Sequence, residues 1–293
     1  MTRAPSAIAL AAILALALTA CEEQAPLTHR PPEPVATQLP EDAPVVDEVT
    51  SIAVVGDSIT LGVHACPGED VCASGSWATG DDPRVGSLRD RARAQNPGVT
   101  VEAFARSGAR MSAAAAAGPQ LVDADPGLAI VLLGANDACA RRVEGMTSPE
   151  DFRAQLTTLL EALATAPGRP YVLVMSVPDL QLVWEALHDE NGALKAWAAN
   201  PSCQSLFADA GSTTADAVER RAQVADRVDA FNAIIGEVCG ATPRCATDGG
   251  ALHAHAFTRD EISPIDYFHP SLLGQTTISQ LVWTALAAVP VEP

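Results

Sequence analysis

The chain has 293 residues, which suffices for one sizeable α/β domain but not for two independent domains once a leader and a tail are set aside. Acidic residues outnumber basic residues by 36 to 18, and the formal net charge at pH 7 is −18. This charge argues against nucleic acids and anionic lipid surfaces as partners, because both would repel the protein.

The first twenty residues are typical of an export signal. A single basic residue, Arg3, precedes an apolar run at residues 7–20 that is too short to span a bilayer comfortably. The sequence LTAC at residues 18–21 resembles the lipobox of bacterial lipoproteins, which are cleaved before the cysteine and lipidated on it. The resemblance implies that Cys21 anchors the protein to a membrane of the bacterial cell envelope. If Cys21 is not lipidated, we expect a secreted protein.

Residues 21–50 are rich in proline and acidic residues and show no sustained helical or strand periodicity. This composition predicts a disordered tether. The domain organisation predicted from the sequence is therefore a signal peptide at residues 1–20, a tether at residues 21–50 that starts with the lipidated cysteine, and a catalytic domain at residues 51–293.

Six cysteines remain when Cys21 is set aside, an even number that favours disulfides in an exported protein. They are Cys66, Cys72, Cys139, Cys203, Cys239 and Cys245. Residues 66–72 and residues 239–245 each enclose a turn-rich loop whose ends can meet, so we expect each loop to be closed by its own disulfide. By elimination, Cys139 then pairs with Cys203. A zinc site is the alternative, but the chain has no Cys-x-x-Cys pair.

Short apolar runs rich in β-branched residues predict strands that are buried on both faces. They occupy residues 51–56, 99–105, 128–133 and 171–177, and residues 251–257 are expected to supply a last strand. Parallel strands need crossover helices, and such helices cover both faces of a sheet.

Amphipathic stretches between and after the strands predict those helices. They cover residues 149–166, residues 180–199 with a break at Gly192, residues 215–239 and residues 271–289. Strands that alternate with helices indicate an α/β protein with three layers, α/β/α, around a doubly wound parallel sheet. In such sheets ligands bind beyond the carboxyl ends of the strands.

Three short motifs carry the chemistry. The sequence GDSIT at residues 56–60 follows the first strand, and GAND at residues 134–137 follows the third. Near the end of the chain, DYFHP places Asp266 and His269 three residues apart, close enough for the carboxylate to fix the imidazole tautomer. Each motif is common by itself, but all three in this order are specific.

Together the motifs resemble those of the SGNH hydrolases, also called GDSL esterases and lipases. The resemblance covers the region from residue 51 to the last helix and implies the flavodoxin-like SGNH hydrolase fold. By position, Ser58 matches the nucleophile, and Asp266 and His269 match its relay. The backbone N–H groups of Ser58 and Gly108 and the side chain of Asn136 match the three donors of the oxyanion hole.

Two positions depart from the family pattern. Arg106 stands where an asparagine is common, which makes Gly108 the weakest match, and Ile59 replaces the leucine of the family name. His64 and Trp77 follow the nucleophile and are candidates to line an acyl pocket, although packing within the loop explains them equally well.

These residues predict a serine carboxylic ester hydrolase, because a serine hydroxyl attacks only when a base accepts its proton. We expect a monomer without metal or organic cofactor that forms an acyl-enzyme and acts on lipid-like or small esters. One alternative keeps the chemistry and moves the substrate to acetylated carbohydrate. Another is a non-catalytic, surface-binding lipoprotein.

Other catalytic arrangements fit the sequence less well. The α/β-hydrolase motif Gly-x-Ser-x-Gly is absent, because Thr60 stands where the second glycine is required. A metal hydrolase could use His253 and His255 with an acid such as Asp260, but a third ligand at convincing spacing is missing.

Overall fold

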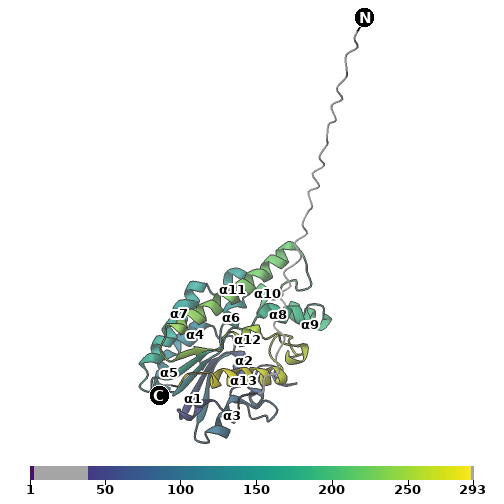
Figure 1. The fold of residues 1–293 in the computed structure, drawn as a ribbon. Helices are drawn as coiled ribbons and strands as arrows, with labels where there is room; N and C mark the ends of the chain where they lie inside the picture. Colours follow the sequence, from purple (N-terminus) through teal and green to yellow (C-terminus); the bar gives the residue numbers. More distant parts are fainter. Residues whose placement is uncertain (3–38, 292–293) are drawn as a thin grey trace. The chain divides into compact units, whose positions relative to one another are not determined.

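A five-stranded parallel sheet forms the centre of the folded domain in the computed structural model, which describes residues 1–2 and 39–291 (Figure 1). The strands are β1 (Ser51–Gly56), β2 (Thr100–Ala105), β3 (Leu128–Val131), β4 (Tyr171–Val174) and β5 (Cys245–Thr247). Their order is β2-β1-β3-β4-β5, and all neighbouring strands are parallel. This is the flavodoxin-like order expected of a doubly wound sheet.

Helices cover both faces of the sheet, as the sequence predicts (Figure 1). One layer contains α4 (Met111–Ala116), α5 (Gly118–Ala124), α7 (Pro149–Thr165) and α11 (Ala215–Gly240). The other layer contains α1 (Pro44–Asp47), α3 (Leu88–Gln95) and α13 (Leu272–Ala287). Every residue of β3 and β4 is buried between these layers, which explains why both strands are continuous apolar runs.

The long predicted helices are confirmed to within two residues at their ends, but the predicted break at Gly192 is wrong. The chain breaks at residues 188–190, between α8 (Leu180–Leu187) and α9 (Asn191–Ala199). Gly192 lies inside α9, where a Cβ would lie 2.3 Å from the hydroxyl oxygen of Tyr267. The glycine therefore permits a close contact rather than a turn.

The predicted last strand at residues 251–257 is also wrong. The fifth strand is the shorter β5, which pairs with β4, and residues 251–254 form a single turn of helix, α12 (Ala251–Ala254). The Asp248 carboxylate accepts hydrogen bonds from the backbone N–H groups of Gly250 and Leu252 and so starts this turn. These hydrogen bonds of Asp248 favour a helical turn at residues 251–254, where the apolar pattern predicts a strand.

The folded domain begins before residue 51, so the last part of the predicted tether is not a linker. Val45 and Val46 on α1 are fully buried, and Val49 is 4% exposed. The side-chain amide of Asn96 donates hydrogen bonds to the carbonyl groups of Val46 and Val49. This segment packs as part of the domain. The signal sequence and Cys21 lie outside the described residues.

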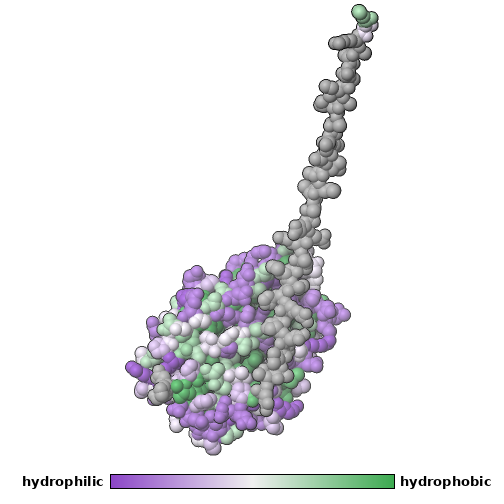
Figure 2. Space-filling model, in the orientation of Figure 1, coloured by the Kyte–Doolittle hydropathy of each residue, from purple (hydrophilic) through white to green (hydrophobic). Residues whose placement is uncertain are grey.

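Three disulfides join the cysteines in the predicted pairs: Cys66 with Cys72, Cys139 with Cys203, and Cys239 with Cys245. Across residues 39–291, no helix has the length and apolar character that crossing a membrane would require. On the face drawn in Figure 2, hydrophilic residues surround smaller hydrophobic patches.

Candidate active site

Ser58 lies where the chain turns from β1 into the short helix α2 (Ser58–Leu61). The turn requires glycine at position 56, since a Cβ there would lie 2.1 Å from Thr60 Oγ1. The Asp57 carboxylate accepts a hydrogen bond from the Ile59 backbone N–H at 2.9 Å and caps the helix. The serine is thus held at the carboxyl edge of the sheet, where ligands bind in this type of fold.

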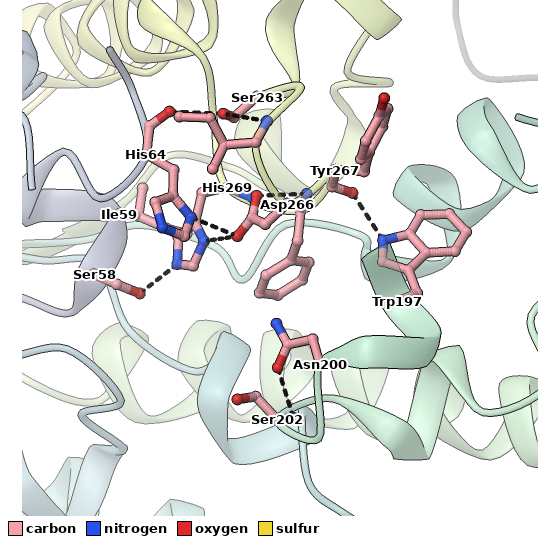
Figure 3. Close-up of polar contacts among 12 residues, drawn as sticks. Ser58, Ile59, His64, Trp197, Asn200, Ser202, Ser263, Asp266, Tyr267 and His269 are labelled. Atoms are coloured by element: carbon pink, nitrogen blue, oxygen red, sulfur yellow. Dashed lines mark hydrogen bonds and ion pairs between the residues drawn. The ribbon is translucent and has the colours of Figure 1, made fainter. Parts of the chain in front are cut away.

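A chain of hydrogen bonds joins Ser58 to Asp266 through His269 (Figure 3). Ser58 Oγ lies 2.9 Å from His269 Nε2, and His269 Nδ1 lies 2.5 Å from Asp266 Oδ2. A carboxylate only accepts hydrogen bonds, so Nδ1 carries the ring proton and Nε2 accepts from the serine hydroxyl. Folding brings together side chains whose positions differ by 211 residues.

A tight loop before α13 presents both Asp266 and His269. Ser263 donates its backbone N–H to the carbonyl of His269 at 2.8 Å, and Tyr267 adopts a left-handed φ of +58°. The indole N–H of Trp197 on α9 donates to the Tyr267 carbonyl at 3.1 Å (Figure 3). The loop is therefore held from its own base and from a neighbouring helix.

Four hydrogen bonds converge on the Asp266 carboxylate. Oδ1 accepts from the backbone N–H groups of Phe268 at 3.0 Å and His269 at 3.1 Å. Oδ2 accepts from the imidazole rings of His269 and of His64, the latter at 2.9 Å. Burial alone would raise the pKa of Asp266, but the hydrogen bonds and charge of His269 and the hydrogen bond of His64 outweigh it and hold that pKa well below its usual range. Asp266 is a carboxylate at any pH at which the protein would function.

The sequence did not predict this contact of His64. Its ring is perpendicular to that of His269, with 5.5 Å between the ring centroids, and its side chain is 25% exposed. A histidine six positions after the nucleophile carries no sequence signal for such a role, because the contact depends on how the loop closed by Cys66 and Cys72 folds. The residue lies beside the hydrogen-bonded chain, not in an acyl pocket of its own.

The two other predicted oxyanion residues lie at the same edge of the sheet as Ser58. Gly108 follows β2 and Asn136 follows β3, and these strands flank β1. Gly108 has a left-handed φ of +73°, and no atom outside its chain neighbours lies within 4 Å of the position of a Cβ. Asn136 lies on α6 (Ala135–Ala138), and its amide nitrogen donates to Asp57 Oδ2 at 2.9 Å. An amide nitrogen has two N–H groups, so one remains for a second acceptor.

Asp57 is the buried support of Asn136 and of the α2 cap. It is 1% exposed, and burial raises its pKa to about 6, although the hydrogen bonds from the Ile59 N–H and from Asn136 and the charge of His269 partly offset this. The negative charge on Asp57 is therefore costly, and it serves to orient the neighbouring amide.

One group of side chains among the described residues could gather around a metal ion: the ligand atoms of His64, Asp266 and His269 lie within 4.8 Å of one another. Oδ2 of Asp266 is 2.5 Å and 2.9 Å from the two ring nitrogens. Those separations fit hydrogen bonds, whereas ligands around a tetrahedral zinc ion at about 2.0–2.1 Å lie roughly 3.3 Å apart. The arrangement does not fit a zinc site as it stands.

The alternative metal ligands do not converge on one point. His253 pairs with Asp229 at 3.2 Å, and His255 pairs with Glu261 at 3.1 Å, so the two imidazoles contact different acids. Glu261 also accepts hydrogen bonds from Thr258 and Thr277. These contacts tie together the segments around the 262–270 loop.

Trp77 belongs to the core and not to a substrate pocket. It is fully buried, and its backbone N–H donates to Gln275 Oε1 at 2.9 Å. A small apolar cavity of about 30 Å³ does lie against His269, with Ile59 and Phe268 in its wall. The cavity has room for about one water-sized group and is lined mainly by core residues.

The fold and the site together define a hydrolase with a flavodoxin-like α/β fold and a site built around a serine, a histidine and an aspartate. Residues 54–276 match the model of the GDSL-like Lipase/Acylhydrolase family, and the chain belongs to this family. It is therefore a hydrolase that acts on ester bonds, as the motifs predict. No curated protein matches the sequence significantly.

Solved structures share the fold at low sequence identity. The crystal structure of TesA is 21% identical with a TM-score of 0.52, covering 82% of this chain and 99% of its own. The α/β hydrolase LAE5, from the metagenome of Lake Arreo in Spain, is 16% identical with a TM-score of 0.52 and coverages of 83% and 97%. A variant of Axe2, an acetyl xylan esterase from Geobacillus stearothermophilus, is 15% identical with a TM-score of 0.50 and coverages of 83% and 97%.

Proposed function

We propose that this esterase works through an acyl-enzyme formed on Ser58, with His269 as general base and Asp266 as the group that orients it. The observation that carries the proposal is the unbroken hydrogen-bonded chain from Ser58 Oγ through both ring nitrogens of His269 to Asp266. The serine hydroxyl attacks the ester carbonyl carbon while His269 Nε2 takes its proton. Asp266, ionised throughout, stabilises the imidazolium that forms.

The attack places a negative charge on the former carbonyl oxygen. In this proposal the N–H groups of Ser58, Gly108 and the Asn136 amide donate to that oxygen. Support comes from the strand order, which puts all three at one edge, and from the open space in front of Gly108. Asp57 fixes one N–H of Asn136 and leaves the other for the oxyanion.

The intermediate then collapses and His269 returns its proton to the leaving alcohol, which departs and leaves the acyl group on Ser58. A water molecule next attacks the acyl-enzyme as His269 again accepts a proton, and the carboxylic acid is released. Both halves use the same base and the same donors.

Lipid-like or other small apolar esters are the proposed substrates. In the folded domain described here, four large apolar side chains are strongly exposed, and three of them belong to segments that build the site. Val71 lies in the loop that carries His64, Ile265 is next to Asp266, and Leu273 follows His269 by four residues. Exposed apolar side chains on three segments that build the site favour apolar acyl groups.

The decisive test is turnover of p-nitrophenyl esters of increasing acyl length by the wild type, Ser58→Ala and Asn136→Ala. We expect Ser58→Ala to lower kcat by on the order of 10⁴ or more, and Asn136→Ala to lower kcat by about 100- to 1,000-fold while the protein stays folded. Partly buried Ser212 offers a matched control, since Ser212→Ala should be fully active and still be labelled by an organophosphonate. Full turnover by Ser58→Ala would refute the proposal.

Other outcomes would favour the alternatives. A strong preference for acetylated xylan over every longer acyl ester would favour a carbohydrate acetylesterase. Absence of both turnover and labelling would favour a surface-binding lipoprotein that has kept the fold.

We also propose that Cys21 is lipidated and holds the enzyme at the bacterial envelope. The support is the LTAC sequence after an apolar run. Mass spectrometry of the mature amino terminus checks this, and an unmodified first residue, or cleavage at another position, would contradict it.

A further inference from the structure

Two imidazoles share one oxygen of the carboxylate at the centre of the site. Asp266 Oδ2 accepts from His269 Nδ1 and from His64 Nδ1, and the two rings come from opposite ends of the domain sequence (Figure 3). We propose that His64 is a positioning residue for ester hydrolysis, which holds Asp266 in its orientation and limits how strongly the carboxylate binds the proton of His269. The inference rests on the proposed roles of Ser58, Asp266 and His269.

The loop around His64 holds the ring in place by several independent contacts. The disulfide between Cys66 and Cys72 and the antiparallel bridge between Val63 and Val71 close the loop. His64 donates its backbone N–H to the Asp70 carbonyl at 3.0 Å. A flexible loop would not hold an imidazole in hydrogen-bonding geometry, so the closure serves the contact.

A second anchor joins this loop to the loop that carries Asp266. The hydroxyl of Ser263 donates to the His64 carbonyl at 2.7 Å (Figure 3). His64 itself has a left-handed φ of +57°, which few residues other than glycine adopt without cost. A non-glycine residue persists in such a conformation when the surrounding contacts over-determine it.

The charge on Asp266 explains why a second donor matters. With one imidazole, the whole carboxylate charge on Oδ2 would act on His269, which would then hold a proton more strongly, so that less of it would be free to accept the serine proton near neutrality. The hydrogen bond from His64 takes up part of that charge. It also stops the carboxylate from rotating about its bond to Cβ, so that Oδ2 stays directed at His269.

In the part of the chain that the structure describes, few titratable groups lie near the two rings. They are Asp266 in the same cluster, Asp57 after β1, which interacts electrostatically with His269, and Asp70, which contacts His64 through its backbone. Within residues 39–291, only Asp266 is hydrogen-bonded to both rings. Removing His64 therefore acts on His269 through this one carboxylate.

Two substitutions at position 64 separate the donor from the ring. His64→Gly removes the side chain and fits the left-handed φ without strain. His64→Asn tolerates the same φ and keeps an N–H donor, because Asn Nδ2 is attached to Cγ as His Nδ1 is. His188→Gln, at the carboxyl end of α8 where the ring stacks on Trp184, controls for loss of a histidine elsewhere.

Steady-state kinetics with a short p-nitrophenyl ester, measured from pH 5 to pH 9 in EDTA, tests the proposal. We expect His64→Gly to lower kcat about tenfold, the loss typical of one hydrogen bond to a charged group, with KM nearly unchanged. The acid limb of kcat/KM should move to higher pH by roughly half a unit. His64→Asn should restore kcat and return the acid limb to the wild-type position or slightly below it.

Each other result overturns the inference. Wild-type kcat and an unmoved acid limb in His64→Gly would show that the contact has no effect on catalysis. Equal impairment of His64→Gly and His64→Asn would show that the ring acts by packing. If His64→Gly does not fold, Ser263→Ala loosens His64 without changing it, and an acid limb that stays in place there would refute the positioning role. Turnover by the wild type and its loss in Ser58→Ala test the proposed function separately.

Discussion

Replacing Asp57 by asparagine should make the domain more stable above pH 6 and the enzyme slower. Asp57 is 1% exposed and, among the described residues, accepts two hydrogen bonds, from the Ile59 backbone and from Asn136. Asparagine has the same shape but cannot carry the buried charge. The two donors contact different carboxylate oxygens, and asparagine has an NH₂ group at one of these positions, so one donor loses its acceptor.

The pKa of Asp57 sets the size of the effect. Burial raises that pKa from 3.8 to about 6, so between these values the folded protein keeps a proton that the unfolded chain has lost. Stability therefore falls as the pH rises from about 4 to about 6 and stays level above that range. A difference of about two pH units corresponds to about 3 kcal/mol.

The hydrogen bond that Asp57→Asn loses reduces the stability that the variant gains by removing the buried charge. One unsatisfied donor costs about 1 kcal/mol at every pH. The Asp57→Asn variant should therefore be about 2 kcal/mol more stable than the wild type at pH 7.5 and about 1 kcal/mol less stable at pH 4. The sign of the difference changes within the range of the titration, which a packing defect would not produce.

Urea denaturation followed by circular dichroism at pH 4, 5, 6 and 7.5 measures the stability difference. Esterase assays of Asp57→Asn, Asn136→Ala and the double variant measure the effect of the same substitution on catalysis. Asp57→Asn should lower kcat at least tenfold on its own and little in the Asn136→Ala background, because both act through one amide. A stability difference that does not vary with pH, or an undiminished effect in the Asn136→Ala background, would refute the reasoning.

Two further predictions concern the supports of the site. The Cys139–Cys203 and Cys239–Cys245 disulfides close loops of 64 and 6 residues. Loop-closure entropy therefore predicts that replacing both cysteines by alanine lowers the free energy of unfolding by about 4 kcal/mol for the first disulfide and by about 2 kcal/mol for the second. Equal losses in urea denaturation would contradict this prediction. Burial alone would raise the pKa of Glu261, but hydrogen bonds from His255, Thr258 and Thr277 lower that pKa from 4.5 to about 2. The Glu261 carboxylate therefore stabilises the fold above pH 4.5, and this contribution is lost as the pH falls towards 2. Glu261→Gln should therefore lower the Tm at pH 7, and the difference in Tm from the wild type should be smaller at pH 3. An equal difference in Tm at both pH values would be evidence against a stabilising Glu261 carboxylate.

The sequence predicts the first four strands better than it predicts β5 and the segment before β1. The first four strands are confirmed, and β1, β3 and β4 are apolar runs buried between two helical layers. The sequence predicts that β2 is buried on both faces, but it is an edge strand in which Thr100 and Glu102 are exposed. β5 is only three residues long and partly exposed, so its sequence carries no strand pattern, and its pairing with β4 places it. The packing of Val45 and Val46 is equally non-local, since it depends on contacts with α3 and α13. The proline and acidic residues around Val45 and Val46 are typical of a linker, so the sequence gives no sign of this packing.

The site divides in the same way. Ser58, Asn136 and the pair Asp266 and His269 lie in motifs that sit at fixed places relative to strands or to each other, so the sequence identifies them and the fold brings Ser58 to His269. His64 has no such motif. Its contact with Asp266 needs the disulfide loop and the 262–270 loop to meet, and this is a property of tertiary structure alone.

The two buried carboxylates of the site show how local donors decide charge. Asp57 is 1% exposed and Asp266 is 9% exposed, yet the pKa of the first is raised by burial and that of the second is held low by hydrogen bonds that outweigh burial. Asp57 accepts two hydrogen bonds from neutral amides, whereas Asp266 accepts four, two of them from imidazoles. Asp266 can therefore stabilise a charged His269 at any working pH, while Asp57 changes its protonation near pH 6. Acid should consequently slow the enzyme at two separate points, the base and the support of the oxyanion donor, and Asp57→Asn would remove only the second.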